Sequence, residues 1–236
     1  MAMSGITDFH SHILPGIDDG CRTVAESLEL LQMESEQGIT RVVATPHFYP
    51  QRDNPDRFLR RREASELLLR EAMAGRSDLP QVHVGAEVYY FRGMSDSEML
   101  TELAIDRKKA ILVEMPRAPW TDAMYRDLEG LCGRRGLTPV IAHVDRYLSV
   151  WRDFGIPDRL AELPVLVQAN GDFFLDWTTA RKALQMLKTE KIHLLGSDCH
   201  NTTDRKPNLG KTVDIIRKHL GEGALERMEF RGNSIL

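Results

Sequence analysis

Cysteine and long hydrophobic runs are both scarce in this chain of 236 residues. Its three cysteines, Cys21, Cys132 and Cys199, are too few for the disulfide framework of a small secreted domain and are typical of a reducing compartment. No apolar run approaches the ~20 residues that span a bilayer, and residues 1–5 are too short and polar for a signal peptide. We therefore expect a cytoplasmic protein without membrane insertion.

Positive charge is also in short supply. There are 31 lysine and arginine residues against 35 aspartate and glutamate residues, which gives a formal net charge of −4. Proteins that bind nucleic acid through its phosphates usually carry a basic excess, so we expect no nucleic-acid partner. The chain has no low-complexity tract, and 42% of its residues are hydrophobic, which suits a packed core. The sequence predicts a single domain over residues 1–236.

Short apolar segments alternate with helical patterns along the chain. The segments typical of strands lie at residues 7–12, 41–44, 81–84, 110–113, 139–142, 165–168 and 192–196. Helices are predicted between Thr23 and Gly38 and over residues 56–74, 122–135, 178–189 and 209–220, followed by a short tail. Such alternation produces parallel β/α units, and seven strands are enough to close a barrel, so we predict an α/β barrel. Four arginines of the second helix are expected to face solvent: Arg57, Arg60, Arg61 and Arg62.

Histidine and carboxylate residues occur where the predicted strands end. These residues are His10, His12, His47, Glu87, Glu114, His143, Asp198 and His200. The chemistry of β/α barrels lies at the carboxyl ends of the strands, so these side chains are expected to meet at one rim. Imidazoles and carboxylates without a required thiolate suit manganese, iron or zinc in a catalytic site. The sequence therefore predicts a catalytic metal centre.

The first strand and the turn after it supply several of these candidates. His10 and His12 alternate along the strand, so both side chains can face one metal ion. Asp8 is expected to support these ligands rather than to bind metal. The following turn offers Asp18 and Asp19, and spacing alone does not choose between them.

Six stretches of the chain together resemble the polymerase-and-histidinol-phosphatase (PHP) superfamily of metal-dependent phosphoesterases. They are DFHSHILPGIDDG, ATPHFYP, GAEVYY, LVEMP, PVIAHVDRY and GSDCHNTTDRKP, and they lie between residues 8 and 207. The sequence is most similar to the bacterial manganese-dependent protein-tyrosine phosphatases of capsule and exopolysaccharide synthesis. The resemblance implies a distorted (β/α)7 barrel, in agreement with the seven predicted strands.

The resemblance also implies three divalent metal ions, with manganese as the preferred metal and iron or zinc as alternatives. The first ion would use His10, His12, Glu87 and Asp198. The second ion would share Glu87 and add Glu114 and His143. The third ion would use Asp19, His47 and His200, with Asp19 chosen over Asp18 by the family turn. Two arginines, Arg146 and Arg205, match family residues that bind phosphate.

A centre of this kind favours a phosphomonoester dianion as its substrate. Three divalent ions outweigh the charge of four carboxylate ligands and leave the site positive. Metal binding lowers the pKa of water to near ~7, so we expect direct in-line attack by a metal-bound hydroxide without a phosphoenzyme. The implied substrate is a phosphotyrosine-bearing protein, in particular a bacterial tyrosine kinase. Six aromatic residues are candidates for walls around the phosphotyrosine ring or for ordinary packing: Phe48, Tyr49, Tyr89, Tyr90, Trp120 and Tyr147.

Other activities on the same scaffold are alternatives. A histidinol-phosphate or other small-molecule phosphatase would use the same ligands, although the GIDDG and HVDRY stretches favour the tyrosine-phosphatase branch. A metal-binding module without turnover is disfavoured by the complete ligand set. A nuclease domain attached to a polymerase is disfavoured because the sequence has no basic groove signature.

Cys199 and Arg205 have the C-x5-R spacing of cysteine-dependent tyrosine phosphatases. In those enzymes a thiolate attacks phosphorus while the loop amides hold the oxygens. The residues between Cys199 and Arg205 include no glycine that would let the amides converge on a phosphate. We expect Asp198 and His200 to face the site and Cys199 to point away from it.

Overall fold

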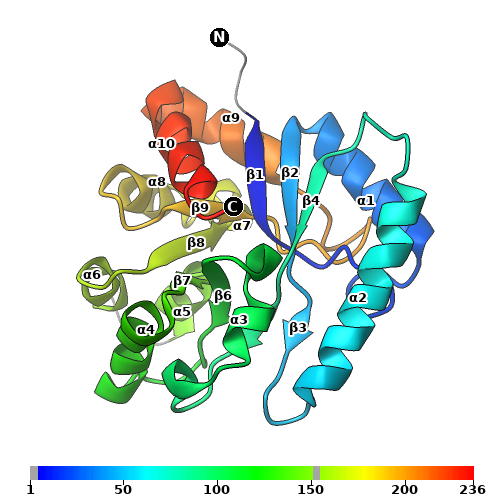
Figure 1. Ribbon diagram of the computed structural model, residues 1–236. Helices are drawn as coiled ribbons and strands as arrows, with labels where there is room; N and C mark the ends of the chain where they lie inside the picture. The colour runs from blue at the N-terminus through cyan, green and yellow to red at the C-terminus, as the bar shows by residue number, and fades with distance from the viewer. Residues whose placement is uncertain (1–4, 151–154) are drawn as a thin grey trace.

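Parallel strands lie at the centre of the computed structural model, which describes residues 5–150 and 155–236, and helices surround them (Figure 1). The strands are β1 (Ile6–Ser11), β2 (Ile39–Ala44), β3 (His47–Phe48), β4 (Gln81–Val84), β5 (Glu87–Tyr89), β6 (Ala110–Glu114), β7 (Thr138–Ile141), β8 (Leu166–Asn170) and β9 (Leu194–Gly196). The α-helices are α1 (Val24–Glu36), α2 (Pro55–Ala72), α3 (Leu100–Leu103), α4 (Asp122–Arg135), α5 (Asp145–Val150), α6 (Ile156–Ala161), α7 (Asp172–Leu175), α8 (Ala180–Lys188), α9 (Leu209–Leu220) and α10 (Glu222–Asn233). Two 3-10 turns, η1 (Met94–Asp96) and η2 (Ile105–Arg107), precede β6.

The strands follow one another around a distorted barrel, which confirms the predicted fold class. A three-stranded sheet has the order β1-β2-β4, and a six-stranded sheet has the order β3-β5-β6-β7-β8-β9, with parallel pairing in both. The segment after β9 returns to β1: Asp198 N donates to His10 O over 2.7 Å, and His12 N donates to Cys199 O over 2.9 Å. This junction connects the last strand, β9, to the first, β1, next to the ligand candidates.

The predicted strands at residues 41–44 and 81–84 are present as β2 and β4, and each is followed, after a break, by a further short strand that the sequence did not predict. Residues 45–46 separate β2 from β3, and residues 85–86 separate β4 from β5. Pro46 has no N–H for a strand ladder, which accounts for the first break. At the second break, Gly85 lies so close to η2 that a Cβ there would be 3.3 Å from Ile105 Cα. η2 packs against both β4 and β6, and the barrel is distorted at this point.

Arg62 of α2 is buried beside the second break, so the prediction that it faces solvent is wrong. Its guanidinium donates to Gly85 O over 3.0 Å and to Glu102 O over 2.7 Å. The carbonyl of Gly85 at the strand break and that of Glu102 in the short helix α3 need donors from elsewhere, and Arg62 supplies one to each. The other three arginines of the group are exposed, as predicted.

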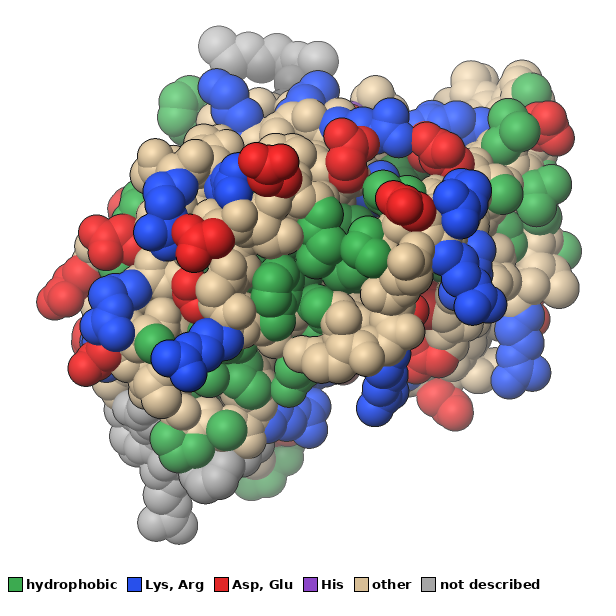
Figure 2. Space-filling model, turned by 60° about the horizontal axis from the view of Figure 1, so that its bottom comes forward, with side chains coloured by type: hydrophobic (Ala, Val, Ile, Leu, Met, Phe, Trp, Pro, Cys, Tyr) green, Lys and Arg blue, Asp and Glu red, His purple; other side chains and the backbone are tan. Residues whose placement is uncertain are grey.

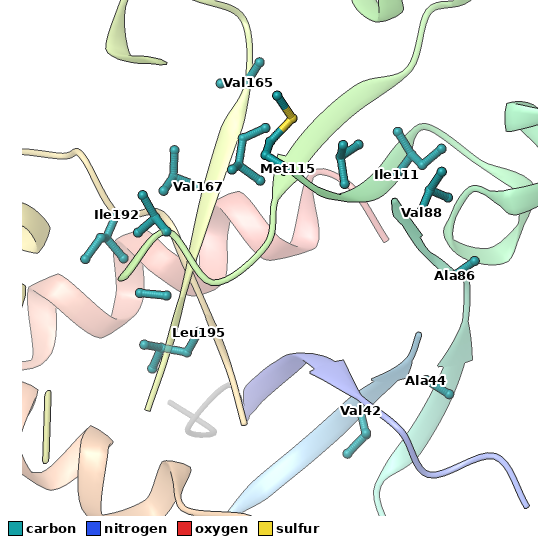
Figure 3. Packing of buried hydrophobic residues seen from close by; sticks show 14 of the residues in the cluster. Val42, Ala44, Ala86, Val88, Ile111, Met115, Val165, Val167, Ile192 and Leu195 are labelled. Atoms are coloured by element: carbon teal, nitrogen blue, oxygen red, sulfur yellow. The ribbon is translucent and has the colours of Figure 1, made fainter. Parts of the chain in front are cut away.

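The strands separate two hydrophobic layers. Val42, Ala44 and Ile111 belong to the large cluster that lies between the strands and the helices (Figure 3). Val43 and Leu112, their neighbours in sequence, belong to a smaller cluster inside the barrel. Alternate residues of a strand point to opposite faces, so strands covered on both faces are apolar throughout.

The C-terminal segment forms α10, and the prediction of a short tail is wrong. Gly221 ends α9 with φ of 78°, a left-handed conformation that glycine adopts readily and that turns the chain into α10. Leu225 and Met228 are buried on one face of α10, and Ile235 beyond it joins the cluster inside the barrel. The C-terminus therefore lies beside β1 and β9 (Figure 1), and Lys108, two residues before β6, donates to Leu236 O, so the C-terminus is at the amino ends of the strands.

The described surface is mixed in charge. Figure 2 shows acidic and basic side chains interspersed over one face, with a strip of hydrophobic side chains between them. None of the helices in residues 5–150 and 155–236 combines the length and apolar character that a membrane span requires.

The contact between α10 and β1 predicts opposite effects for two glycines of the same helix. A Cβ at Gly232 would lie 2.8 Å from Cζ of the buried Phe9, whereas a Cβ at Gly223 would meet only Arg227 Nη1 at 3.6 Å. Gly232→Ala should lower the free energy of unfolding by about 1–3 kcal/mol through overpacking. Gly223→Ala should leave it unchanged or raise it by up to about 1 kcal/mol, because alanine favours helix. Urea unfolding measures both, and equal midpoints for the two variants would contradict the packing.

Candidate metal centre

All nine ligand candidates lie together at the carboxyl end of the barrel. They come from β1 and the turn after it (His10, His12, Asp19), from the starts of β3 and β5 (His47, Glu87), from the end of β6 (Glu114) and from the segments after β7 and β9 (His143, Asp198, His200). The strand breaks have a role here, because β3 and β5 pair with His47 directly opposite Glu87. After each break, a new short strand begins, and its first residue is a ligand candidate.

Glu87 lies at the middle of the group. Its Oε1 is 2.8 Å from His143 Nε2, and its Oε2 is 2.8 Å from His47 Nδ1 and 3.2 Å from His10 Nε2. Only 1% of the Glu87 side chain is exposed. Glu114 Oε1 lies 3.7 Å from His143 Nε2, on the same side of the group.

Asp198 and Asp19 extend the group toward β9 and toward the turn after β1. Asp198 Oδ1 is 3.6 Å from His10 Nε2 and 3.5 Å from His12 Nε2. Asp19 Oδ1 is 3.4 Å from His47 Nε2 and 3.5 Å from His200 Nε2. One carboxylate oxygen therefore lies between two imidazole nitrogens at each of these places, an arrangement suited to a shared cation.

Unsatisfied buried atoms show that the group fits divalent ions. His200 Nε2 is buried and forms no hydrogen bond within the described residues, and Glu87 Oε2 and His47 Nδ1, although 2.8 Å apart, form none with each other. Buried polar atoms are normally hydrogen-bonded. These atoms point toward other ligand candidates instead, so they need a further partner such as a cation. Burial lowers the pKa of His143 and of His200 to about 4, which keeps both rings in the neutral form that binds metal.

The ligand atoms fall into overlapping sets whose members lie within 4.8 Å of one another. One set is His10, Glu87 and His143, and a second is His10, His12 and Asp198. A third is His12, Asp19, His47 and His200, and a fourth is His47, Glu87 and Glu114. His12 approaches the Asp19 set as well as the Asp198 set, which differs from the division implied by the resemblance.

Asp18 lies behind the ligand candidates, while Asp19 lies among them. Asp18 Oδ2 is 2.8 Å from His12 Nδ1 and accepts from His47 N over 3.0 Å, and Oδ1 accepts from Gly20 N over 3.0 Å. Burial opposes ionisation of Asp18, but its hydrogen bond and charge interaction with His12, together with its bonds from the Gly20 and His47 amides, outweigh burial and hold its pKa below the usual range. Asp18 therefore orients the imidazole of His12, and the alternative left open by spacing is resolved in favour of Asp19 as the residue facing the group.

Gln168 and Asn170 of β8 also support the group, and the sequence analysis assigned them no role. Gln168 Oε1 accepts from His143 N over 2.7 Å, and Gln168 Nε2 donates to Asn170 Oδ1 over 2.9 Å. Asn170 Nδ2 then donates to Asp198 Oδ2 over 3.2 Å. The only signal in the sequence is their position at a strand end. This relay holds two residues with positive φ, His143 at 33° and Asp198 at 55°, in conformations that non-glycine residues rarely adopt.

Arg146 and Arg205 both contact the group of ligand candidates at Asp198. Arg146 Nη2 forms an ion pair with Asp198 Oδ2, and Arg205 Nη2 lies 2.9 Å from Asp198 Oδ1. Arg146 is 25% exposed and Arg205 is 41% exposed, so both guanidinium groups lie at the edge between the buried ligands and solvent. A phosphate at this edge would meet two planar donors.

Residues 6–235 match the family described as capsular polysaccharide synthesis, CpsB/CapC. The chain belongs to this family. Among curated proteins, it is 26% identical over 226 residues to tyrosine-protein phosphatase CpsB of Streptococcus agalactiae, with 91% of each chain covered. It is 28% identical over 225 residues to tyrosine-protein phosphatase YwqE of Bacillus subtilis, with 91% of this chain and 85% of that protein covered.

A solved structure shares the fold of this CpsB/CapC family member. The structure is from a study of YwqE from Bacillus subtilis and CpsB from Streptococcus pneumoniae, described as unique metal-dependent tyrosine phosphatases. The TM-score is 0.79 at 23% identity, and 94% of each chain is covered. The likeness supports the distorted barrel read from the strands.

Cys199 of this CpsB/CapC chain points away from the metal centre, as the sequence analysis expected. Its Sγ is fully buried and lies 4.0 Å from Glu34 Oε1, on the side of α1. Asp8 lies in the same cluster and accepts from His10 N over 3.0 Å and from Ser197 N over 2.9 Å. Asp8 therefore fixes the junction of β1 and β9 from behind, as expected of a supporting residue, and burial raises the pKa of the Cys199 thiol well above its usual range.

The burial of the thiols predicts which cysteine reacts with iodoacetamide. Burial raises the pKa of Cys21 to about 12 and that of Cys199 further above its usual range, so neither supplies thiolate at neutral pH. Cys132 is only partly buried. Burial raises the pKa of the Cys132 thiol as well, but its side chain stays partly accessible. In native protein at pH 7.5, Cys132 should therefore be labelled at least about tenfold faster than the other two. Peptide mass spectrometry measures the labelling rates. Rapid labelling of Cys199 in the native protein would favour the cysteine-dependent mechanism instead.

Proposed function

We propose that this chain is a metal-dependent protein-tyrosine phosphatase that acts on a phosphotyrosine-bearing protein, in particular a bacterial tyrosine kinase of capsule or exopolysaccharide synthesis. The observation that carries the proposal is the group of nine histidine and carboxylate side chains with two arginines at its edge, in a chain of the CpsB/CapC family. The curated relatives CpsB and YwqE are named tyrosine-protein phosphatases. We infer that residues 1–236 act as one catalytic domain in the cytoplasm, where its three unpaired cysteines would stay reduced.

Three divalent ions, with manganese preferred and iron or zinc as alternatives, fit the ligand candidates. His10, His12, Glu87 and Asp198 would hold one ion, Glu87, Glu114 and His143 a second, and Asp19, His47 and His200 a third. When bound, such ions generate a nucleophile from water at neutral pH and stabilise charge on the phosphoryl oxygens.

The residues of the chain supply orientation and the remaining charge. Asp18 holds the His12 ring, and Gln168 holds the backbone of His143, so the ligand geometry is set before substrate binds. Arg146 and Arg205 would exchange part of their ion pairing with Asp198 for the phosphate oxygens of the substrate. The phenolate of tyrosine is already a fair leaving group, so little general-acid help is required.

Removal of metal tests the proposal most directly. Chelation followed by desalting should abolish hydrolysis of a phosphotyrosine peptide, and added Mn²⁺ should restore it, because the proposed nucleophile depends on metal. Metal content is measured alongside by elemental analysis. Full activity of the stripped protein would overturn the proposal. A higher kcat/KM for histidinol phosphate than for the peptide would favour the small-molecule alternative.

Exchange of two buried glutamates for glutamine separates the metal centre from the core. Glu87→Gln should lower kcat/KM by more than the ~10–100-fold typical of residues behind the ligands and should reduce metal content, because Glu87 is assigned to two ions. The control is Glu34→Gln: burial and then the nearby Asp8 raise the pKa of Glu34 well above its usual range, so glutamine replaces a neutral group. Activity of the Glu34 variant should stay within about threefold of wild type. Unchanged metal content and turnover in the Glu87 variant would show that Glu87 is not a metal ligand.

A further inference from the structure

Two tyrosines lie directly outside the metal centre. Tyr49 follows His47 by two residues, and Tyr89 follows Glu87 by two residues at the end of β5. Residues two apart in an extended segment point to the same side, so each tyrosine points to the side of the ligand candidate that precedes it. The ring of Tyr49 lies 5.3 Å from the ring of His47 and 5.8 Å from the ring of Tyr89.

The register of β3 and β5 explains why these rings meet. His47 pairs with Glu87 and Phe48 with Val88, so the next position outward brings Tyr49 opposite Tyr89. Opposed side chains on neighbouring strands lie close enough for aromatic rings to interact. The two tyrosines thus form the layer immediately outside the layer that contains His47 and Glu87.

The other four aromatic candidates are buried and have packing roles. Phe48 packs edge-to-face on Phe58 with ring centroids 5.0 Å apart, and the Tyr147 hydroxyl accepts from Met115 N over 2.8 Å. Tyr90 and Trp120 are also buried. Tyr49 and Tyr89 remain half-buried, with part of each side chain accessible. They are therefore the two of the six whose rings can contact a bound molecule.

The loop before α2 fixes the position of Tyr49. Tyr49 O accepts from Arg52 N and Asp53 N over 2.8 Å each, and Tyr49 N donates to Asp53 Oδ2 over 2.8 Å. The guanidinium carbon of Arg52 lies 5.5 Å from the centroid of the Tyr49 ring, a cation–π contact. A ring held in this way loses little freedom when a ligand packs on it.

We propose that Tyr49 and Tyr89 form a clamp for the aromatic ring of the substrate and thereby select aryl phosphates over alkyl phosphates. The inference rests on the proposed phosphatase function and adds the specificity-determining residues. In an aryl phosphate, the ring is one oxygen atom from phosphorus, so a phosphoryl group resting on the ions that His47 and Glu87 would hold brings the ring to the two tyrosines. An alkyl phosphate has no ring at this position and gains nothing from the clamp.

The test compares two phosphonates that are not hydrolysed, benzylphosphonate and methylphosphonate, as competitive inhibitors of the Mn²⁺-loaded enzyme. Tyr49→Ala and Tyr89→Ala should each raise the inhibition constant of benzylphosphonate by about 3–10-fold, the range expected for one aromatic pair. The constant for methylphosphonate should stay within about twofold, because its phosphonate group meets the same metal centre and arginines. Tyr49→Phe keeps the ring and should retain the wild-type ratio of the two constants.

Tyr90→Phe is the matched control, because Tyr90 is the neighbour of Tyr89 and its hydroxyl donates to the buried Asp127 over 2.8 Å. Its ratio of inhibition constants should equal that of wild type. Tyr49→Leu keeps apolar bulk without a ring and replaces Tyr49→Ala if that variant loses metal. If variants that lack either ring keep their metal and show an unchanged ratio of the two inhibition constants, the clamp is overturned. The phosphatase function is still upheld in that case if the wild type hydrolyses phosphotyrosine peptide. Failure of the proposed function is different: the Mn²⁺-loaded wild type would then hydrolyse no phosphotyrosine peptide.

Discussion

The charge of one buried carboxylate, Glu87, has to be compensated, and the rim of the barrel is arranged around it. A carboxylate removed from water is costly unless close partners favour its ionised form. Nitrogens of His10, His12, His47 and His143 lie 2.8–3.5 Å from its oxygens. Burial opposes ionisation, but His10 foremost, with His12 and His143, outweighs it and holds the pKa of Glu87 well below its usual range. The four histidines come from three separate places around the barrel. The centre is therefore assembled only when the barrel is closed.

Supporting residues keep this concentration of polar groups ordered. Asp18 orients one imidazole from the turn after β1, while Gln168 secures the backbone of His143 from β8. Asp8 joins β1 to the segment after β9 through the amide groups of His10 and Ser197. The ligand candidates are thus held by contacts between neighbouring strands, which is where precise catalytic geometry is best maintained.

The strand breaks place the two tyrosines of the proposed clamp beside the ligand candidates. Each break ends one strand and begins another with a ligand candidate, and the paired short strands then carry Tyr49 and Tyr89 outward. At the second break, Arg62 donates to Gly85 O, and η2 lies close against Gly85.

The sequence by itself determined the barrel and eight of the nine ligand candidates, because apolar strands and the polar residues that end them are local patterns. Parallel strands bring their carboxyl ends to one rim, so position along each strand was enough to predict the meeting of these side chains. The tertiary structure decided the rest. It placed Asp19 among the ligand candidates and Asp18 behind them, recruited Gln168, buried Arg62 and made α10 a helix that packs on Phe9. Each of these depends on contacts between segments far apart in the chain, which local periodicity does not encode.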